Sequence, residues 1–143
     1  MFFLKELPTK AMLDKYTSDL SGHEKNSITE ALGIMRKASL LVRSIESFFS
    51  ANDLSQLRFL VLIVIDREPD RTSLYAHEIA SRLDVSRPVL TRAIKRLIDD
   101  ELLTSINDEI DKRAKKITLT EKGRTCLSNV LPGYFNEINK LMD

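Results

Sequence analysis

The chain has 143 residues, the size of a single domain that buries about two-thirds of its unfolded surface. Its content of 43% hydrophobic and 30% charged residues is ordinary for a soluble globular protein, and no run of 18 apolar residues could span a membrane. The net charge of +1 excludes bulk attraction to nucleic acid, so any such affinity must come from local patches. The single cysteine, Cys126, excludes an internal disulfide and fits a reducing cytoplasm, and Met1–Leu4 is too short for a secretion signal.

The first fifty residues are predicted to form two helices. Residues 1–20 carry a ragged apolar stripe, with Pro8 suited to a first helical turn, and either contribute to a dimer or pack on their own subunit. The polar residues 18–26 are predicted to form a linker. Ser27 and Glu30 have the spacing of a capping box, and the apolar period of 3.6 residues predicts a helix from Ser27 to about Ser50.

The stretch from Leu54 to Ile65 is ambiguous. Its β-branched residues favour a buried strand, whereas a cap at Ser55 favours a buried helix, which we predict. This helix is expected to end by Arg67, because the residue before Pro69 resists the helical conformation. Residues 72–74 are predicted to form a short strand.

Residues 76–100 have the pattern of two short helices joined by a tight turn. Ser86 is a preferred N-cap for the second helix, and Pro88 lies in its first turn. One face of this second helix is apolar, and the other carries Arg87, Thr91, Arg92, Lys95 and Arg96. A helix-turn-helix presents such a face to the major groove of DNA, although a solvated surface would have the same composition.

Two β-prone runs, 102–106 and 116–120, follow directly and predict a hairpin. The nine residues between them, 107–115, are mostly charged. A hairpin after a helix-turn-helix is the order of elements in a winged helix. The tip contains Lys112, Arg113 and Lys115, which could reach phosphates or a minor groove, although taken alone it could be an exposed loop.

The remaining residues predict two short helices and no catalytic site. Thr120 is expected to cap a helix that Pro132 and Gly133 break, before a last helix from Tyr134. Neither histidine is paired with a nucleophile, there is no glycine-rich phosphate loop, and no metal-ligand spacing occurs. We therefore expect no enzyme, no cofactor and no metal. Both ends of the chain are apolar, which favours a dimer.

The motifs resemble those of the MarR (multiple antibiotic resistance regulator) family over residues 28–135. The resemblance is carried by Leu54–Leu62, Glu78–Ala80, Val85–Ser86, Thr91–Arg92, Asp111–Arg113 and Leu119–Arg124. The chain departs from the family's usual pattern at four positions: Tyr75 replaces a threonine, Glu101 a glycine, Ser105 an arginine, and Lys112 an arginine.

The resemblance implies a mainly α protein with a small β-wing, in which residues 54–120 form the winged-helix DNA-binding region. Residues 1–50 and 121–143 would be dimerisation helices of a single domain spanning 1–143. It implies a homodimeric, ligand-responsive repressor on an inverted-repeat operator of double-stranded DNA. The expected DNA-binding residues are Ser86, Arg87, Pro88, Val89, Thr91, Arg92, Lys95, Arg96, Asp111, Lys112, Arg113 and Lys115.

Family members often bind ligands between the dimer helices and the winged helix. A small anionic aromatic effector would then contact Arg43, Ser47, Phe48, Phe59 and Ile63, although core packing also explains the apolar members of this set. The alternative function is a winged-helix adaptor that uses the same basic face to bind a protein. Steep weakening by salt would identify DNA binding.

Overall fold

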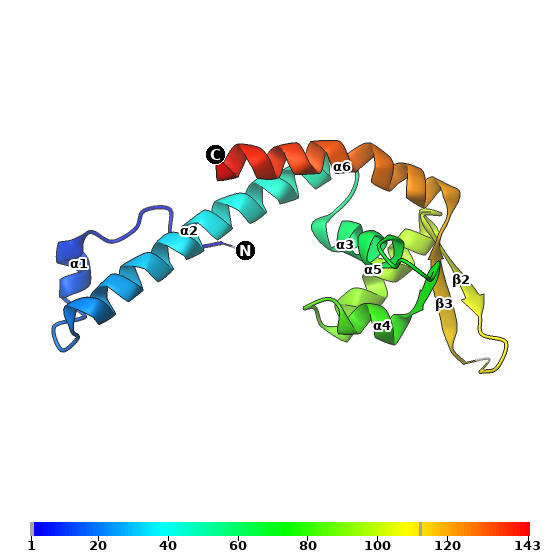
Figure 1. Cartoon of the computed structure of the whole chain (residues 1–143), viewed down its shortest axis with the longest axis horizontal. Coiled ribbons are helices and arrows are strands. Elements are labelled where there is room, and N and C mark those ends of the chain that lie inside the picture. Colours follow the sequence, from blue (N-terminus) through cyan, green and yellow to red (C-terminus); the bar gives the residue numbers. More distant parts are fainter. Residues whose placement is uncertain (1, 112) are drawn as a thin grey trace.

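A computed structural model describes residues 2–111 and 113–143 of the chain. It is mainly helical with a small sheet, as predicted, and its elements in chain order are α1 (Lys10–Asp14), α2 (Gly22–Ala51), α3 (Gln56–Asp66), β1 (Ser73–Tyr75), α4 (Ala76–Ser81), α5 (Arg87–Asp99), β2 (Leu103–Asn107), β3 (Lys115–Leu119) and α6 (Glu121–Met142). Helices α2 and α6 form an arm in which their C-terminal parts lie side by side; the N-terminal part of α2 projects beyond α6 with α1 against its end, and the remaining elements form a body at the other end (Figure 1).

The sheet is antiparallel, with the strand order β1-β3-β2. In β3, Ile117 faces Leu74 of β1 and Ser105 of β2, and its side chain is buried. The alternation of buried and exposed residues along β3 continues at Leu119, which is also buried. The predicted hairpin is therefore confirmed with a shift of one residue, and the arrangement is a winged helix.

Residues Gln56–Asp66 form helix α3 at the centre of the core. The prediction of a helix, and not a strand, is therefore confirmed. The Ser55 hydroxyl accepts a hydrogen bond from the Arg58 backbone N–H at 3.1 Å, as expected for an N-cap. The helix packs against α2 and α6, and also against α5 and β3, which explains its hydrophobic residues on nearly all sides. Within the described residues no single helix is long and apolar enough to cross a membrane; α2 and α3 meet the criterion only as a pair, with an 84° bend between them.

The start of α2 differs from the prediction. Helix α2 begins at Gly22, because the Ser21 hydroxyl accepts from the Glu24 N–H at 3.2 Å and the Glu24 carboxylate accepts from the Ser21 N–H at 2.7 Å. Ser27 lies inside the helix and donates to the His23 carbonyl. The sequence allows two capping boxes, one at Ser21 and one at Ser27. The helix starts after Ser21, because each residue that is added to the helix contributes a further helical hydrogen bond. The predicted linker over 18–26 is therefore wrong from Gly22 onward.

The predicted N-terminal helix is also shorter than expected. Only Lys10–Asp14 is helical, with Thr9 as its cap, so Pro8 precedes the helix instead of lying in its first turn. Five residues cannot sustain an isolated helix, since nucleation is costly. Helix α1 is instead supported by α2, through an ion pair of 3.4 Å between Asp14 and Lys25.

The predicted break at Pro132 is wrong, because α6 continues to Met142. Pro132 is exposed, so water can hydrate the carbonyl group that the missing N–H leaves unbonded. Gly133 lies directly against Phe48 of α2, where an added Cβ would approach the ring to 2.7 Å. This close packing of α6 on α2 outweighs the local cost of the Pro-Gly pair.

Helices α2 and α5 end in the same way. Asp53 and Glu101 follow the respective caps with φ angles of 56° and 62°, in the left-handed region. The Leu102 N–H donates to the Leu97 carbonyl at 2.9 Å, and the Glu101 N–H donates to the Ile98 carbonyl at 3.0 Å, which is a Schellman motif. This end directs the chain from α5 into the wing.

Candidate nucleic-acid interface

The first helix of the helix-turn-helix, α4, is anchored by Glu78. Its carboxylate accepts two hydrogen bonds of 2.6 Å from the Arg71 guanidinium and one of 3.0 Å from the Tyr75 N–H. These bonds, chiefly those from Arg71, lower the pKa of Glu78 to about 2. Arg82 donates to the Glu78 carbonyl and pairs with Glu68 at 3.0 Å. The position of α4 is therefore tied to the loop that precedes β1.

The second helix, α5, has the two faces that the sequence predicts. Its buried face consists of Leu90, Ala93, Ile94 and Leu97. The predicted contact residues on the other face are exposed, apart from the half-buried Val89; the exposed ones are Ser86, Arg87, Pro88, Thr91, Arg92, Lys95 and Arg96. Ser86 is the N-cap residue, although its side chain makes no capping hydrogen bond.

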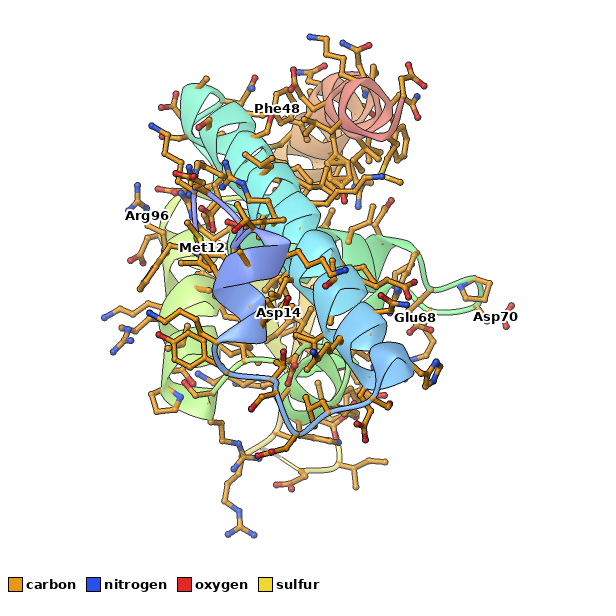
Figure 2. All side chains as sticks on the ribbon, turned by 90° about the vertical axis from the view of Figure 1, so that its left-hand side faces the viewer. Met12, Asp14, Phe48, Glu68, Asp70 and Arg96 are labelled. Carbon is orange, nitrogen blue, oxygen red and sulfur yellow. The ribbon has the colours of Figure 1, made fainter. Side chains whose placement is uncertain are left out.

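One cation of α5 is held in place by an acid. The Arg96 Nε donates to Asp100 Oδ2 at 2.9 Å, across one turn of the helix. Figure 2 shows Arg96 pointing outward on one side of the molecule, with Glu68 and Asp70 on the opposite side in that view. Arg96 therefore lies away from these two acids.

The wing tip is ordered by backbone contacts. The Asp108 N–H donates to the Ala114 carbonyl at 3.0 Å, and the Ala114 N–H donates to the Asp111 carbonyl at 3.0 Å. Asp111, Arg113 and Lys115 are all exposed. Lys112, the other predicted contact in the tip, lies outside the described residues.

A cleft of about 390 Å³ lies between the start of α4, the N-terminal part of α5 and the wing. It brings together Arg87 from α5 with Arg113 and Lys115 from the wing, which the sequence proposed separately. It also contains Tyr75 and His77, whose rings stack at a centroid distance of 5.6 Å. Neither residue is among the contacts predicted from the sequence, in which the unusual tyrosine at position 75 is the indication.

The residues proposed to bind an effector differ in their exposure to solvent. Arg43 and Ser47 lie one turn apart on the exposed side of α2, and Phe48 is half-buried and points toward α6 (Figure 2). Phe59 is only 2% exposed; its ring stacks with that of Phe49 and lies tilted against that of Tyr134, with a centroid distance of 4.7 Å to each. Ile63 is partly buried against the same core. Arg43 is therefore on an exposed side of α2, whereas Phe59 is enclosed in the core.

The described residues include no group of three or more His, Cys, Asp or Glu side chains that could hold a metal ion. Cys126 is partly buried, and burial raises the pKa of its thiol, while Arg58 and Lys122 oppose the shift. The thiolate is the reactive form of cysteine, so this environment lowers the reactivity of Cys126.

Comparison with known proteins points to one family. The MarR family model matches residues 52–114, which include α3, the helix-turn-helix and the first part of the wing. The chain is similar to the HTH-type transcriptional repressor YetL of Bacillus subtilis (strain 168), with 25% identity over 140 residues that cover 98% of this chain and 83% of YetL.

Two solved structures have the same fold. The MarR family regulator Sco3205 from Streptomyces coelicolor, in complex with DNA, has a TM-score of 0.74 at 20% identity over 85% of this chain and 75% of that chain. BpsR of Bordetella bronchiseptica, whose DNA binding is regulated by 6-hydroxynicotinic acid, has a TM-score of 0.67 at 18% identity over 79% of this chain and 83% of that chain.

Proposed function

This chain belongs to the MarR family of transcriptional regulators, and we propose that it binds an inverted-repeat operator in double-stranded DNA as a homodimer. The observation that carries this proposal is the cleft in which α5 and the wing meet. Arg87, Arg113 and Lys115 line it together, and none of its described lining residues is acidic. A chain with a net charge of +1 thus concentrates cations where a recognition helix and a wing would meet DNA.

The recognition helix and the wing have different roles in this proposal. Ser86, Arg87, Pro88 and Val89 begin α5 and would lie nearest the base edges in the major groove. Arg113 would enter the minor groove, with Asp111 orienting it, and Lys115 would contact a nearby phosphate. The remaining exposed residues of α5 would contact phosphates or nearby bases: Thr91, Arg92, Lys95 and Arg96.

The arm formed by α2 and α6 supports the homodimer. Ile34 of α2 is 62% exposed, and Met35, Leu40, Phe135 and Met142 are exposed as well. Apolar side chains along helices that project from the body are typical of a surface that another chain covers. A two-fold axis through the arm would pair two α5 helices for two half-sites.

The regulation that we propose is repression relieved by a small anionic aromatic effector. YetL is named as a repressor and the DNA binding of BpsR is regulated by 6-hydroxynicotinic acid, which supports this choice for a family member. Arg43 is the candidate anion partner, and its exposed position favours a site on the outer side of α2. If Arg43→Ala leaves the release from DNA by every tested aromatic acid unchanged, Arg43 has no part in effector binding.

Selection of bound duplexes from random DNA with the purified full chain tests the main proposal. An enriched inverted repeat, bound with an affinity that falls steeply with salt, is the expected result. Arg92→Ala should weaken binding to that repeat. Arg67→Ala, an exposed arginine next to Glu68 and away from α5, is the matched control and should not weaken it. No enrichment, or binding to DNA that is insensitive to salt, would favour a protein-binding adaptor instead.

A further inference from the structure

We propose that His77, stacked on Tyr75, binds a DNA backbone phosphate in the cleft between α4, α5 and the wing, and that its protonation strengthens DNA binding as the pH falls. This inference rests on the proposed DNA-binding function and adds a contact and a pH dependence to it. The two residues concerned, Tyr75 and His77, belong to β1 and α4, and not to α5 or the wing tip.

The two rings occupy a defined place. Tyr75 ends β1 and is half-buried, opposite Lys116 of β3, and His77 follows in the first turn of α4 and is exposed. Their planes are 8° from parallel, with 5.6 Å between centroids. The stack restricts the imidazole, so less side-chain entropy is lost when it binds.

The charges around His77 come from every neighbouring element. Arg87 of α5 and Arg113 and Lys115 of the wing share its cleft, and Lys116 lies opposite Tyr75. The adjacent acid, Glu78, is engaged by Arg71 and by the Tyr75 N–H. Two of these cations are next to acids of the wing: Arg113 lies 3.8 Å from Asp111, and Lys116 lies 3.7 Å from Asp108.

A phosphate bound in the cleft would add a negative charge next to the imidazole of His77. This negative charge offsets the cations, and a protonated imidazole can donate a charge-assisted hydrogen bond to a phosphate oxygen. An imidazole ordinarily changes its charge between pH 5 and 8, so DNA binding would take up a proton in this range. Lower pH should therefore tighten binding, and the uptake of one proton limits the change to about tenfold per pH unit.

The test measures affinity for the selected operator by fluorescence anisotropy at pH 6 and pH 8, at constant ionic strength, with the full chain. The wild type should bind about 3- to 10-fold more tightly per unit fall in pH. His77→Gln should lose most of this dependence, and its salt slope at pH 6 should fall by about one. His23→Gln, the matched control at the start of α2, should keep both.

Two further variants separate a phosphate contact from a structural role. His77→Arg carries a permanent cation and should bind at pH 8 nearly as tightly as the wild type does at pH 6. Tyr75→Leu removes the ring under the imidazole and should reduce the pH dependence without abolishing DNA binding. Melting curves check that all variants fold.

The inference and the proposed function fail in different ways. If the wild type binds no DNA sequence at any salt concentration, the proposed function fails. If it binds an operator and His77→Gln keeps the full pH dependence and salt slope, only the role of His77 is overturned. The same holds if inorganic phosphate, at equal ionic strength, competes equally with operator binding by the wild type and by His77→Gln at pH 6.

Discussion

Asp111 Oδ1 accepts a hydrogen bond from the backbone N–H of Arg113 at 3.0 Å and lies 3.8 Å from the Nε of the same residue. The Asp111 N–H in turn donates to Asp108 Oδ2 at 3.2 Å. The Arg113 side chain is 96% exposed, and ion pairs this exposed contribute little to stability. Asp111 therefore positions Arg113 mainly by ordering the backbone of the wing tip.

Replacement of Arg113 by alanine should weaken operator binding by about 1–3 kcal/mol, the usual range for a lost specific contact. The melting temperature should stay nearly unchanged, because the side chain is exposed. Titration of the operator with both proteins, together with thermal melts, measures the two effects. A large fall in melting temperature would show a structural role for Arg113 instead.

Replacement of Asp111 by alanine should also weaken operator binding, although it removes a negative charge near DNA. The reason is that the Arg113 N–H loses its acceptor and the tip loses its order. Asp111→Asn retains an acceptor oxygen and should bind more tightly than Asp111→Ala. Glu109→Ala, another exposed acid of the tip, is the control and should not weaken binding. Tighter binding by Asp111→Ala at two salt concentrations would contradict positioning.

Replacement of Glu101 by glycine should stabilise the protein by about 1 kcal/mol, because the residue has a φ of 62° that side chains with a Cβ disfavour. Urea unfolding measures the change in the free energy of unfolding. Glu101→Ala keeps the Cβ and serves as the control, with no comparable gain expected. Equal stabilisation by both variants would show that removal of the acid, and not backbone strain, is responsible.

The ion pair between Glu78 and Arg71 should make stability depend on pH in the acid range. The pKa of Glu78 is lowered to about 2 in the folded chain, from 4.5. Its contribution is therefore present above about pH 4.5 and is lost as the pH falls toward 2. Urea unfolding between pH 6 and 2.5 should show a steeper loss of stability for the wild type than for Glu78→Gln. Parallel curves would exclude this contribution.

Replacement of Ile34 by aspartate should convert a dimer into monomers, because Ile34 lies on the exposed side of the α2 arm. Sedimentation at micromolar concentration measures the state of the wild type and the variant. Arg67→Ala, at the end of α3 and outside the arm, is the control and should remain dimeric. The wild-type dimer should span half-sites roughly 10 bp apart, centre to centre. A wild-type monomer bound to one half-site would overturn this prediction.

The sequence by itself determined the elements whose pattern is local. The apolar period of residues 89–98 predicted both faces of α5, and the alternation in residues 116–120 predicted the wing strand, because side-chain direction follows directly from helix and strand geometry. The cap at Ser55, together with the family resemblance over Leu54–Leu62, identified α3 as a helix despite its β-branched residues.

The tertiary structure alone decided the outcome where local preferences conflict. It also decided which residues that are far apart in the sequence come into contact. Helix α6 passes through Pro132 because Gly133 packs on Phe48, a contact between residues 85 positions apart in the sequence (133 − 48). The proposed effector residue Phe59 is enclosed by Phe49 and Tyr134, and the cleft joins His77 to Arg113 across the β1–β3 pairing. These contacts depend on how helices and strands pack together, and the periodicity of one segment carries no information about its partner.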